Sequence, residues 1–209
     1  PWAALALATG GDDLPIVGFL LLAVVLAANR RPWGAGVTLG IVSAMKFTAW
    51  PVAALLLFAA RDAEGRRAWR QMLLAEAVVA VPIVAVFLAW NPSSFMANVV
   101  KFPLGMAGVD SPAGSALPGH LLVSHVPSIH HAYAVVVALA MAVGLCVYLW
   151  RRPPYSVAKV CTVAAWALLI AICLAPATRI GYLIYPANLF VWAWMLESDQ
   201  SANELEPAG

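Results

Sequence analysis

Long apolar stretches follow one another along almost the whole chain, and polar residues are confined to the gaps between them. The stretches cover residues 14–29, 34–60, 72–90, 132–150 and 157–196. Several of them reach the roughly 20 helical residues that cross the hydrocarbon core of a bilayer. None shows the alternation of apolar and polar positions that is typical of a half-buried strand. The pattern therefore predicts an all-α protein, a polytopic transmembrane helical bundle.

Within this pattern two interruptions predict short, broken hairpins. Residues 34–47 and 52–60 are too short to be full spans at 1.5 Å per residue, so we expect the chain to turn at residues 46–51, below the membrane surface. A second turn is expected at residues 176–182. We place a transmembrane domain at residues 1–196 and a polar, disordered tail at residues 197–209. The first eight residues look like the end of a helix, which suggests a fragment of a larger protein.

The longest gap, residues 91–131, is predicted to be an external loop that carries interfacial helices. Asn91 followed by Pro92 is typical of a helix start, because Asn caps the first turn and Pro fits its first position. A second short helix is expected at residues 120–126, and the part between them is rich in Gly, Pro, Ser and Ala. Loops of this length are usually functional or disordered.

Composition agrees with a membrane protein. Hydrophobic residues make up 63% of the chain and charged residues 11%, about half the charge of a soluble domain. The net charge of +2 gives no reason to expect a nucleic-acid partner. The three cysteines lie inside apolar stretches and are interpreted as packing residues.

The basic residues indicate an orientation, because Lys and Arg favour the cytoplasmic ends of short loops. Three gaps hold nine of the twelve: Arg30, Arg31, Arg61, Arg66, Arg67, Arg70, Arg151, Arg152 and Lys159. With these gaps on the cytoplasmic side, Lys46, Lys101 and Arg179 fall on the outer face. We therefore expect an integral plasma-membrane protein whose functional face is exoplasmic.

Two adjacent carboxylates, Asp12 and Asp13, precede the first complete apolar stretch. They can cap the following helix and interact with its dipole. They can equally act as an acid or base, or bind a ligand, at the membrane surface.

Lys46 is the only charge between Arg31 and Arg61. A lysine at a helix end can extend its amino group to water. A cation at this depth, however, usually faces a cavity or a partner, and the phosphate of an anionic lipid is the natural ligand. Gly36, Gly40 and Ser43 precede it at spacings of four and three, which favours close helix contact.

Arg179 is likewise the only charge between Lys159 and Glu197. Its guanidinium matches a phosphate group well. Tyr182 and Tyr185 follow within two turns and are candidates for sugar contacts or for interfacial anchors. His120 could bond a hydroxyl or a phosphate. The spacing of the four histidines matches no metal motif, so we expect neither a metal nor another cofactor.

In the order of its motifs the chain resembles the C-terminal part of polytopic glycosyltransferases of the GT-C superfamily, and glycosyltransferase family 87 most of all. The motifs are the external Gly-Gly-Asp-Asp of residues 10–13, the Arg-Arg-Pro turn of residues 30–32, the small-residue segment 35–51 that contains Lys46, and residues 179–186. The resemblance covers most of residues 10–196.

The resemblance implies an enzyme that takes a sugar, mannose or a related hexose or pentose, from a polyprenyl-phosphate donor. The sugar passes with inversion to a hydroxyl of a glycolipid or glycan acceptor of the cell envelope. Lys46 and Arg179 would bind the donor phosphate, and His120, Lys101, Tyr182 and Tyr185 would contact substrate. Asp12 and Asp13 are candidate catalytic carboxylates, although the family's main base lies in an upstream loop, so a fragment alone should be inactive.

Two other functions stay open at this point. The two interrupted hairpins also occur in transporters with broken-helix repeats. A non-catalytic membrane scaffold is the second alternative.

Overall fold

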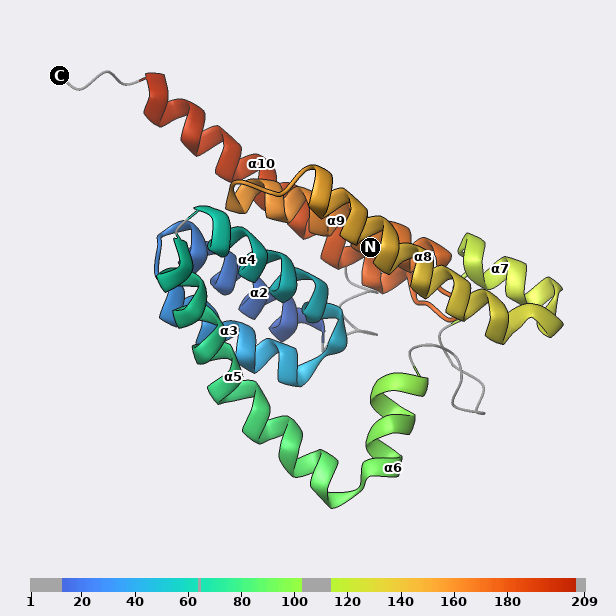
Figure 1. The fold of residues 1–209 in the computed structure, drawn as a ribbon. Helices are drawn as coiled ribbons and strands as arrows, with labels where there is room; N and C mark the ends of the chain where they lie inside the picture. Colours follow the sequence, from blue (N-terminus) through green and yellow to red (C-terminus); the bar gives the residue numbers. More distant parts are fainter. Residues whose placement is uncertain (1–12, 64, 103–113, 206–209) are drawn as a thin grey trace. The chain divides into compact units, whose positions relative to one another are not determined.

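The computed structural model describes residues 13–63, 65–102 and 114–205 (Figure 1). These residues are almost entirely helical, and apart from an isolated bridge between Gly114 and Thr178 they carry no β-structure. The predicted all-α class is confirmed.

The helices follow the apolar stretches closely. They are α2 Asp13–Ala28, α3 Pro32–Met45, α4 Trp50–Ala63, α5 Gly65–Trp90, α6 Pro92–Phe95, α7 Pro118–His125, α8 His130–Arg151, α9 Val157–Leu174 and α10 Ile184–Leu205. Short 3-10 turns occupy Phe47–Ala49, Pro127–Ile129 and Ile180–Leu183, and a π-helical turn occupies Met96–Lys101. The predicted start at Asn91 is confirmed, because its side chain accepts a hydrogen bond of 3.0 Å from the backbone N–H of Ser94.

Three of the described helices are long and apolar enough to cross a membrane: Gly65–Trp90, Pro127–Arg151 and Val157–Leu174. The helices Asp13–Ala28, Pro32–Met45 and Phe47–Ala59 are apolar but shorter. Large apolar side chains of α8, such as Val136, Leu139 and Val143, are exposed. A helix that is apolar around its circumference and still exposed is suited to contact with lipid.

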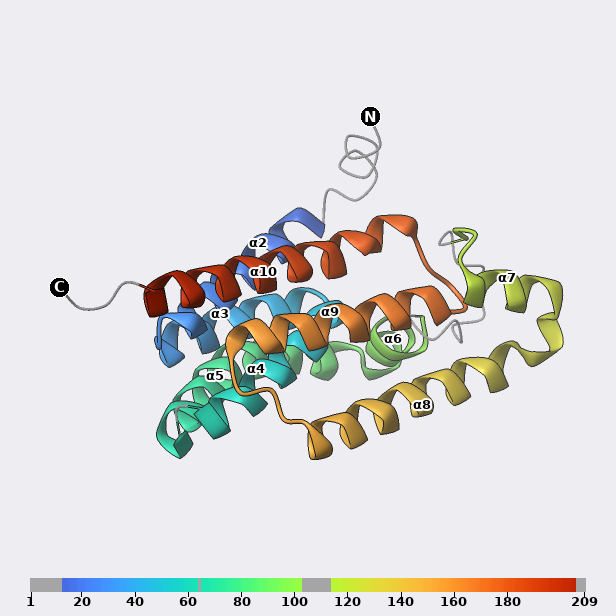
Figure 2. The same ribbon diagram turned by 90° about the horizontal axis from the view of Figure 1, so that it is seen from above.

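The chain divides into two compact units. The first comprises residues 1–80, 154–166 and 184–209, and the second comprises residues 81–153 and 167–183. In the first unit α2 packs against α3, α4 and α10, and Figure 2 shows α10 running beside α2. Its core contains the fully buried side chains of Ile16, Leu20, Leu39, Leu55 and Leu189.

Two glycines let α3 approach α5 closely. A Cβ atom on Gly36 would collide with the backbone oxygen of Met72, and one on Gly40 would lie 2.7 Å from the oxygen of Glu76. The close contact predicted from the small residues of α3 is therefore present. These contacts hold α5 against the middle of α3.

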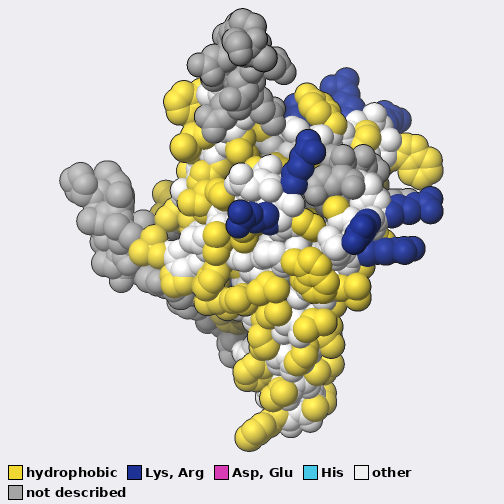
Figure 3. Space-filling view, turned by 90° about the vertical axis from the view of Figure 1, so that its left-hand side faces the viewer, with side chains coloured by type: hydrophobic (Ala, Val, Ile, Leu, Met, Phe, Trp, Pro, Cys, Tyr) yellow, Lys and Arg dark blue, Asp and Glu magenta, His cyan; other side chains and the backbone are white. Residues whose placement is uncertain are grey.

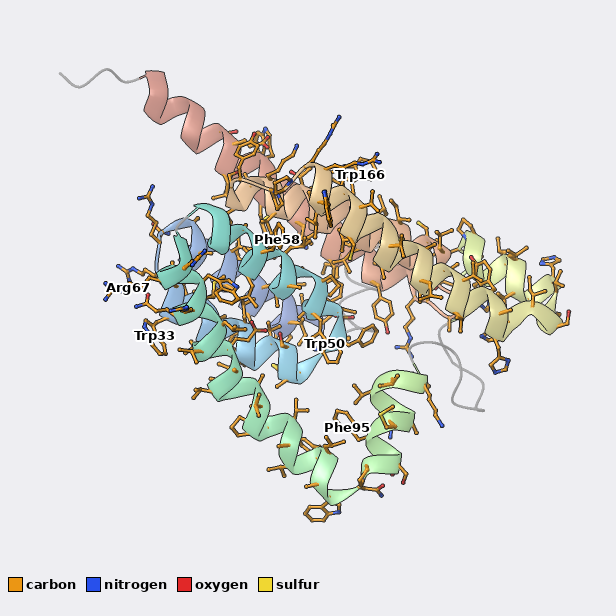
Figure 4. All side chains as sticks on the ribbon, in the orientation of Figure 1. Trp33, Trp50, Phe58, Arg67, Phe95 and Trp166 are labelled. Atoms are coloured by element: carbon orange, nitrogen blue, oxygen red, sulfur yellow. The ribbon has the colours of Figure 1, made fainter. Side chains whose placement is uncertain are left out.

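Exposed arginines gather at one end of the first unit. They come from the connection between α2 and α3 and from the start of α5: Arg30, Arg31, Arg66, Arg67 and Arg70. Figure 3 shows Lys and Arg side chains collected on this face, and Figure 4 labels Arg67 there. The N-terminal end of α2 and the C-terminal end of α3 lie away from these arginines, because each helix is about 20 Å long.

Arg30 ends α2 in a backbone conformation that normally belongs to glycine. Its φ is +54°, and the N–H groups of Arg30 and Arg31 bond the carbonyls of Ala27 and Leu26 at 3.0 and 2.9 Å. This is the Schellman arrangement, in which a residue with a Cβ atom is strained. We expect Arg30→Gly to stabilise the protein by about 1 kcal/mol, measured as a higher unfolding temperature in detergent. Arg31→Gly is the control, because it also removes one positive charge but at a residue whose φ is −108°. This variant should not raise the unfolding temperature.

The C-terminal part differs from its prediction. Disorder is expected from Glu197 onwards, but α10 continues to Leu205. This stretch contains Ala, Glu, Gln and Leu, which are good helix formers, and adding residues to an existing helix is far easier than starting one.

Candidate functional site

A buried carboxylate lies in the first unit, at the N-terminal end of α2. Asp13 is only 6% exposed. Its Oδ1 atom forms an ion pair with Nζ of Lys46 and also accepts a hydrogen bond of 2.5 Å from the hydroxyl of Tyr185. The three residues, which we call the Asp13 cluster, come from α2, from the turn after α3 and from α10.

The local sequence explains why Lys46 points to this position. Lys46 leaves α3 in an extended conformation, with φ −154° and ψ 132°, and the chain reverses through Phe47–Ala49 into α4. The N–H of Lys46 still bonds the carbonyl of Val42 at 3.0 Å. Trp50, labelled in Figure 4, closes the turn by donating from Nε1 to the carbonyl of Ser43 at 2.8 Å. The backbone at Lys46 is thus held on both sides.

Within the Asp13 cluster, the positive charge of Lys46 pairs with the negative charge of Asp13. The side chains of Lys46 and Asp13 are 16% and 9% exposed, and a charge at such a position requires a partner. Both donors use the same oxygen, and a carboxylate oxygen offers two lone pairs. Lys46 therefore does not simply extend into water, and the Asp13 carboxylate interacts with side chains of two other segments.

A second polar contact lies one turn below Lys46, where α3 meets α5. The hydroxyl of Ser43 donates to Oε1 of Glu76 at 3.2 Å, and Oε2 of Glu76 is buried without a hydrogen-bond partner in the described part of the chain. Sequence reasoning left this pair out of the site. The signal available was a carboxylate at residue 76 inside an apolar stretch.

Arg179 belongs to the second unit and is exposed on a turn that other segments hold in place. The N–H of Ser115 donates to the carbonyl of Thr178 at 3.0 Å, and the N–H of Ile180 donates to the hydroxyl of Ser115 at 2.9 Å. These two bonds lie on either side of Arg179 and fix its backbone.

His120 and Tyr133 hold the preceding part of the same turn. The ring nitrogen Nδ1 of His120 lies 3.0 Å from the carbonyl of Pro176, and because a carbonyl only accepts, this nitrogen carries the proton. The hydroxyl of Tyr133 donates to the carbonyl of Leu174 at 2.9 Å. Gly119 lies directly against Leu174, where a Cβ atom would collide with the carbonyl.

We expect Tyr133→Phe to lower the free energy of unfolding by about 1 kcal/mol, because it removes one hydrogen bond from this turn. Thermal unfolding in detergent measures the change. Tyr155 is 77% exposed, so Tyr155→Phe is the matched control and should leave the unfolding temperature unchanged.

The other predicted residues are distributed as follows. Lys101 is exposed at the end of its π-helical turn, and Tyr182 is half-buried in the turn Ile180–Leu183. Both belong to the second unit. Asp12 lies outside the described residues. The structure thus joins Asp13, Lys46 and Tyr185 in one unit and places Arg179, His120, Lys101 and Tyr182 in the other.

The sequence profile described as glycosyltransferase family 87 matches residues 1–196. The chain belongs to glycosyltransferase family 87. No curated protein and no solved structure matches the chain significantly.

Membership of family 87 identifies a membrane glycosyltransferase, whose substrates are a sugar donor and an acceptor. Together with the three long apolar helices, it identifies an integral membrane protein. Of the functions left open by the sequence, family 87 favours the glycosyltransferase over the transporter and the scaffold.

Proposed function

We propose that the protein transfers a sugar, mannose or a related hexose or pentose, from a polyprenyl-phosphate donor to an acceptor hydroxyl on the outer side of the plasma membrane. The observation that carries the proposal is the Asp13 cluster. It pairs a cation and a carboxylate, both largely buried, at the end of an apolar helical unit. Ionisable side chains in such surroundings usually serve a function.

The reaction has simple requirements. The acceptor oxygen forms a bond to the anomeric carbon of the sugar, and the bond from that carbon to the phosphate oxygen breaks. Polyprenyl phosphate leaves with the electron pair and gains a negative charge, while the acceptor proton passes to a base. A fixed cation stabilises the developing charge, and a carboxylate is a suitable proton acceptor.

The residues of the chain fit these requirements. The ammonium group of Lys46 would bind the donor phosphate, and Asp13, with Asp12, would assist proton removal. Arg179, in the second unit, is a further candidate for binding phosphate, because its guanidinium can bind two oxygens at once. His120, Lys101 and Tyr182 would contact the sugar or the acceptor, and Tyr185 would act through Asp13.

A lipid-linked donor also suits the surroundings. The exposed apolar side chains of α5 and α8 are suited to lipid, so a prenyl chain can reach the protein by diffusion within the bilayer. The phosphate of such a donor would lie near the membrane boundary, and the positive-inside pattern predicts Lys46 and Arg179 on the outer side.

The test is a transfer assay with the complete protein in lipid nanodiscs. It compares polyprenyl-phosphate mannose, a polyprenyl-phosphate pentose and the matching nucleotide sugars, each with a glycolipid acceptor. We expect transfer from a polyprenyl-phosphate sugar, with one polyprenyl phosphate released for each sugar transferred. Transfer from the nucleotide sugars alone, or no transfer from any lipid donor, would overturn the proposal.

A further inference from the structure

The cation assigned to the donor phosphate is already occupied. Lys46 pairs with Asp13, and both side chains are largely buried. Asp13 is in turn fully engaged at Oδ1, where Lys46 and Tyr185 use both lone pairs. Lys46 has three N–H donors but one positive charge, so a phosphate that binds Lys46 would bring a second anion close to the Asp13 carboxylate.

We propose that the donor binds by anion exchange: its phosphate displaces the Asp13 carboxylate from Lys46, and the carboxylate, still held by Tyr185, becomes free to accept a hydrogen bond from the acceptor hydroxyl. This inference rests on the proposed function and adds a regulation to the same site. The Asp13–Lys46 ion pair is the resting state of the site, and the donor opens it.

The three partners differ in how easily each can move. Asp13 is in the first turn of α2, Tyr185 is in the first turn of α10, and these two helices pack against each other. Tyr185 is 1% exposed, so its ring is fixed by its surroundings. Lys46 instead extends from a turn on a flexible four-carbon stem. The contact that breaks is therefore the one to Lys46, and the contact to Tyr185 persists.

The exchange gives the reaction an order. Before the donor binds, Lys46 and Tyr185 occupy both lone pairs of Oδ1, and the ammonium group of Lys46 pairs with the charge of the carboxylate. After the donor binds, one lone pair of Oδ1 is released beside the phosphate that now occupies Lys46. Once the ammonium group has turned to the phosphate, no cation neutralises the carboxylate, so proton transfer from the acceptor hydroxyl, or from a water molecule, is favoured after the donor has bound.

A fixed-frame arrangement is the competing explanation. In that case Asp13 holds Lys46 in the position that the phosphate needs, and both contacts remain during binding. The two explanations predict opposite effects of removing the carboxylate, because a competitor weakens phosphate binding and a positioning group strengthens it.

The first experiment measures binding of polyprenyl monophosphate, without a sugar, to the complete protein in nanodiscs. With Asp13→Asn we expect the Kd to fall about tenfold, while the transfer rate falls as well. A Kd that rises or stays unchanged would overturn the exchange. The free polyprenol and inorganic phosphate are tested in parallel, to separate recognition of a lipid headgroup from recognition of phosphate alone.

The second experiment measures the same Kd in a Tyr185→Phe variant, which leaves the charges of Asp13 and Lys46 unchanged. Tyr185→Phe removes the hydrogen bond that stabilises the released carboxylate, so Asp13 should hold Lys46 more strongly and the Kd should rise several-fold. In the Asp13→Asn background the same substitution should have no effect, because there is no carboxylate to release. An equal effect in both backgrounds would contradict the exchange.

Lys46→Met separates the two proposals. If Lys46→Met binds polyprenyl monophosphate as tightly as the unchanged protein, the donor site itself is wrong. If Lys46→Met weakens binding and Asp13→Asn weakens it too, the donor site stands and only the exchange fails. Lys159→Met, which removes a lysine in the first turn of α9, is the matched control and should leave the Kd unchanged.

Discussion

Replacing Lys46 by methionine should lower kcat/KM for a polyprenyl-phosphate sugar by a factor of about 10²–10³. Methionine keeps most of the length of the side chain and removes its charge. Loss of one preorganised group that stabilises transition-state charge typically costs about 3–4 kcal/mol. Because the leaving phosphate gains charge as the sugar departs, kcat should fall more than KM rises.

The measurement is a steady-state transfer assay with the complete protein, in which donor concentration is varied at saturating acceptor. Lys159→Met is the control for the loss of a positive charge and should keep full activity. Lys46→Arg keeps the charge in a different shape and should recover part of the rate. An unchanged kcat/KM in Lys46→Met would remove this residue from the donor site.

The second large effect concerns the contact between α3 and α5. Gly36→Ala should destabilise the protein by about 3 kcal/mol, because overpacking a close helix contact is costly. The added Cβ atom would meet the backbone oxygen of Met72 and lie 2.8 Å from Cβ of Ala75. Neither atom can turn away as the end of a long side chain would, so the two helices must separate. Since Lys46 directly follows the last residue of α3, separation also shifts the Asp13 cluster.

Gly18→Ala is the matched control for this prediction. Gly18 lies inside α2 and has open space where its Cβ would be. Alanine is a better helix former than glycine, so this variant should be slightly more stable than the unchanged protein. We expect the unfolding temperature, measured in the same detergent, to fall for Gly36→Ala and to rise slightly for Gly18→Ala. A Gly36→Ala variant as stable as Gly18→Ala would show that α3 and α5 do not require the close contact.

Much of the helical structure could be predicted because the signals are local. The short arms at residues 34–47 and 52–60 became α3 and α4, and the turn between them falls at Lys46 as expected. Asn91 begins a helix since its side chain can reach the third N–H that follows. The end of α10 could not be placed in this way, because polar, helix-forming residues are compatible with both helix and coil.

The candidate site was predictable only in its separate members. Lys46 and Arg179 were conspicuous as isolated charges, and Asp13 as a carboxylate before an apolar helix. The role of Tyr185 was not visible, since a tyrosine near a membrane boundary is expected to anchor or to bind sugar. Its burial and its bond to Asp13 come from the packing of α10 against α2.

The order of residues was sufficient to establish membrane helices, the glycine-lined face of α3 and the few charges that need an explanation. Each of these depends on near neighbours along the chain. Lys46 lies 33 positions after Asp13 in the sequence, and Tyr185 lies 172 positions after it. Only the fold brings both side chains to the same oxygen atom of Asp13. Where neighbouring helices are largely apolar, as α2 and α3 are, hydrophobicity does not select neighbours. Close packing of small residues and the pairing of buried charges make that choice.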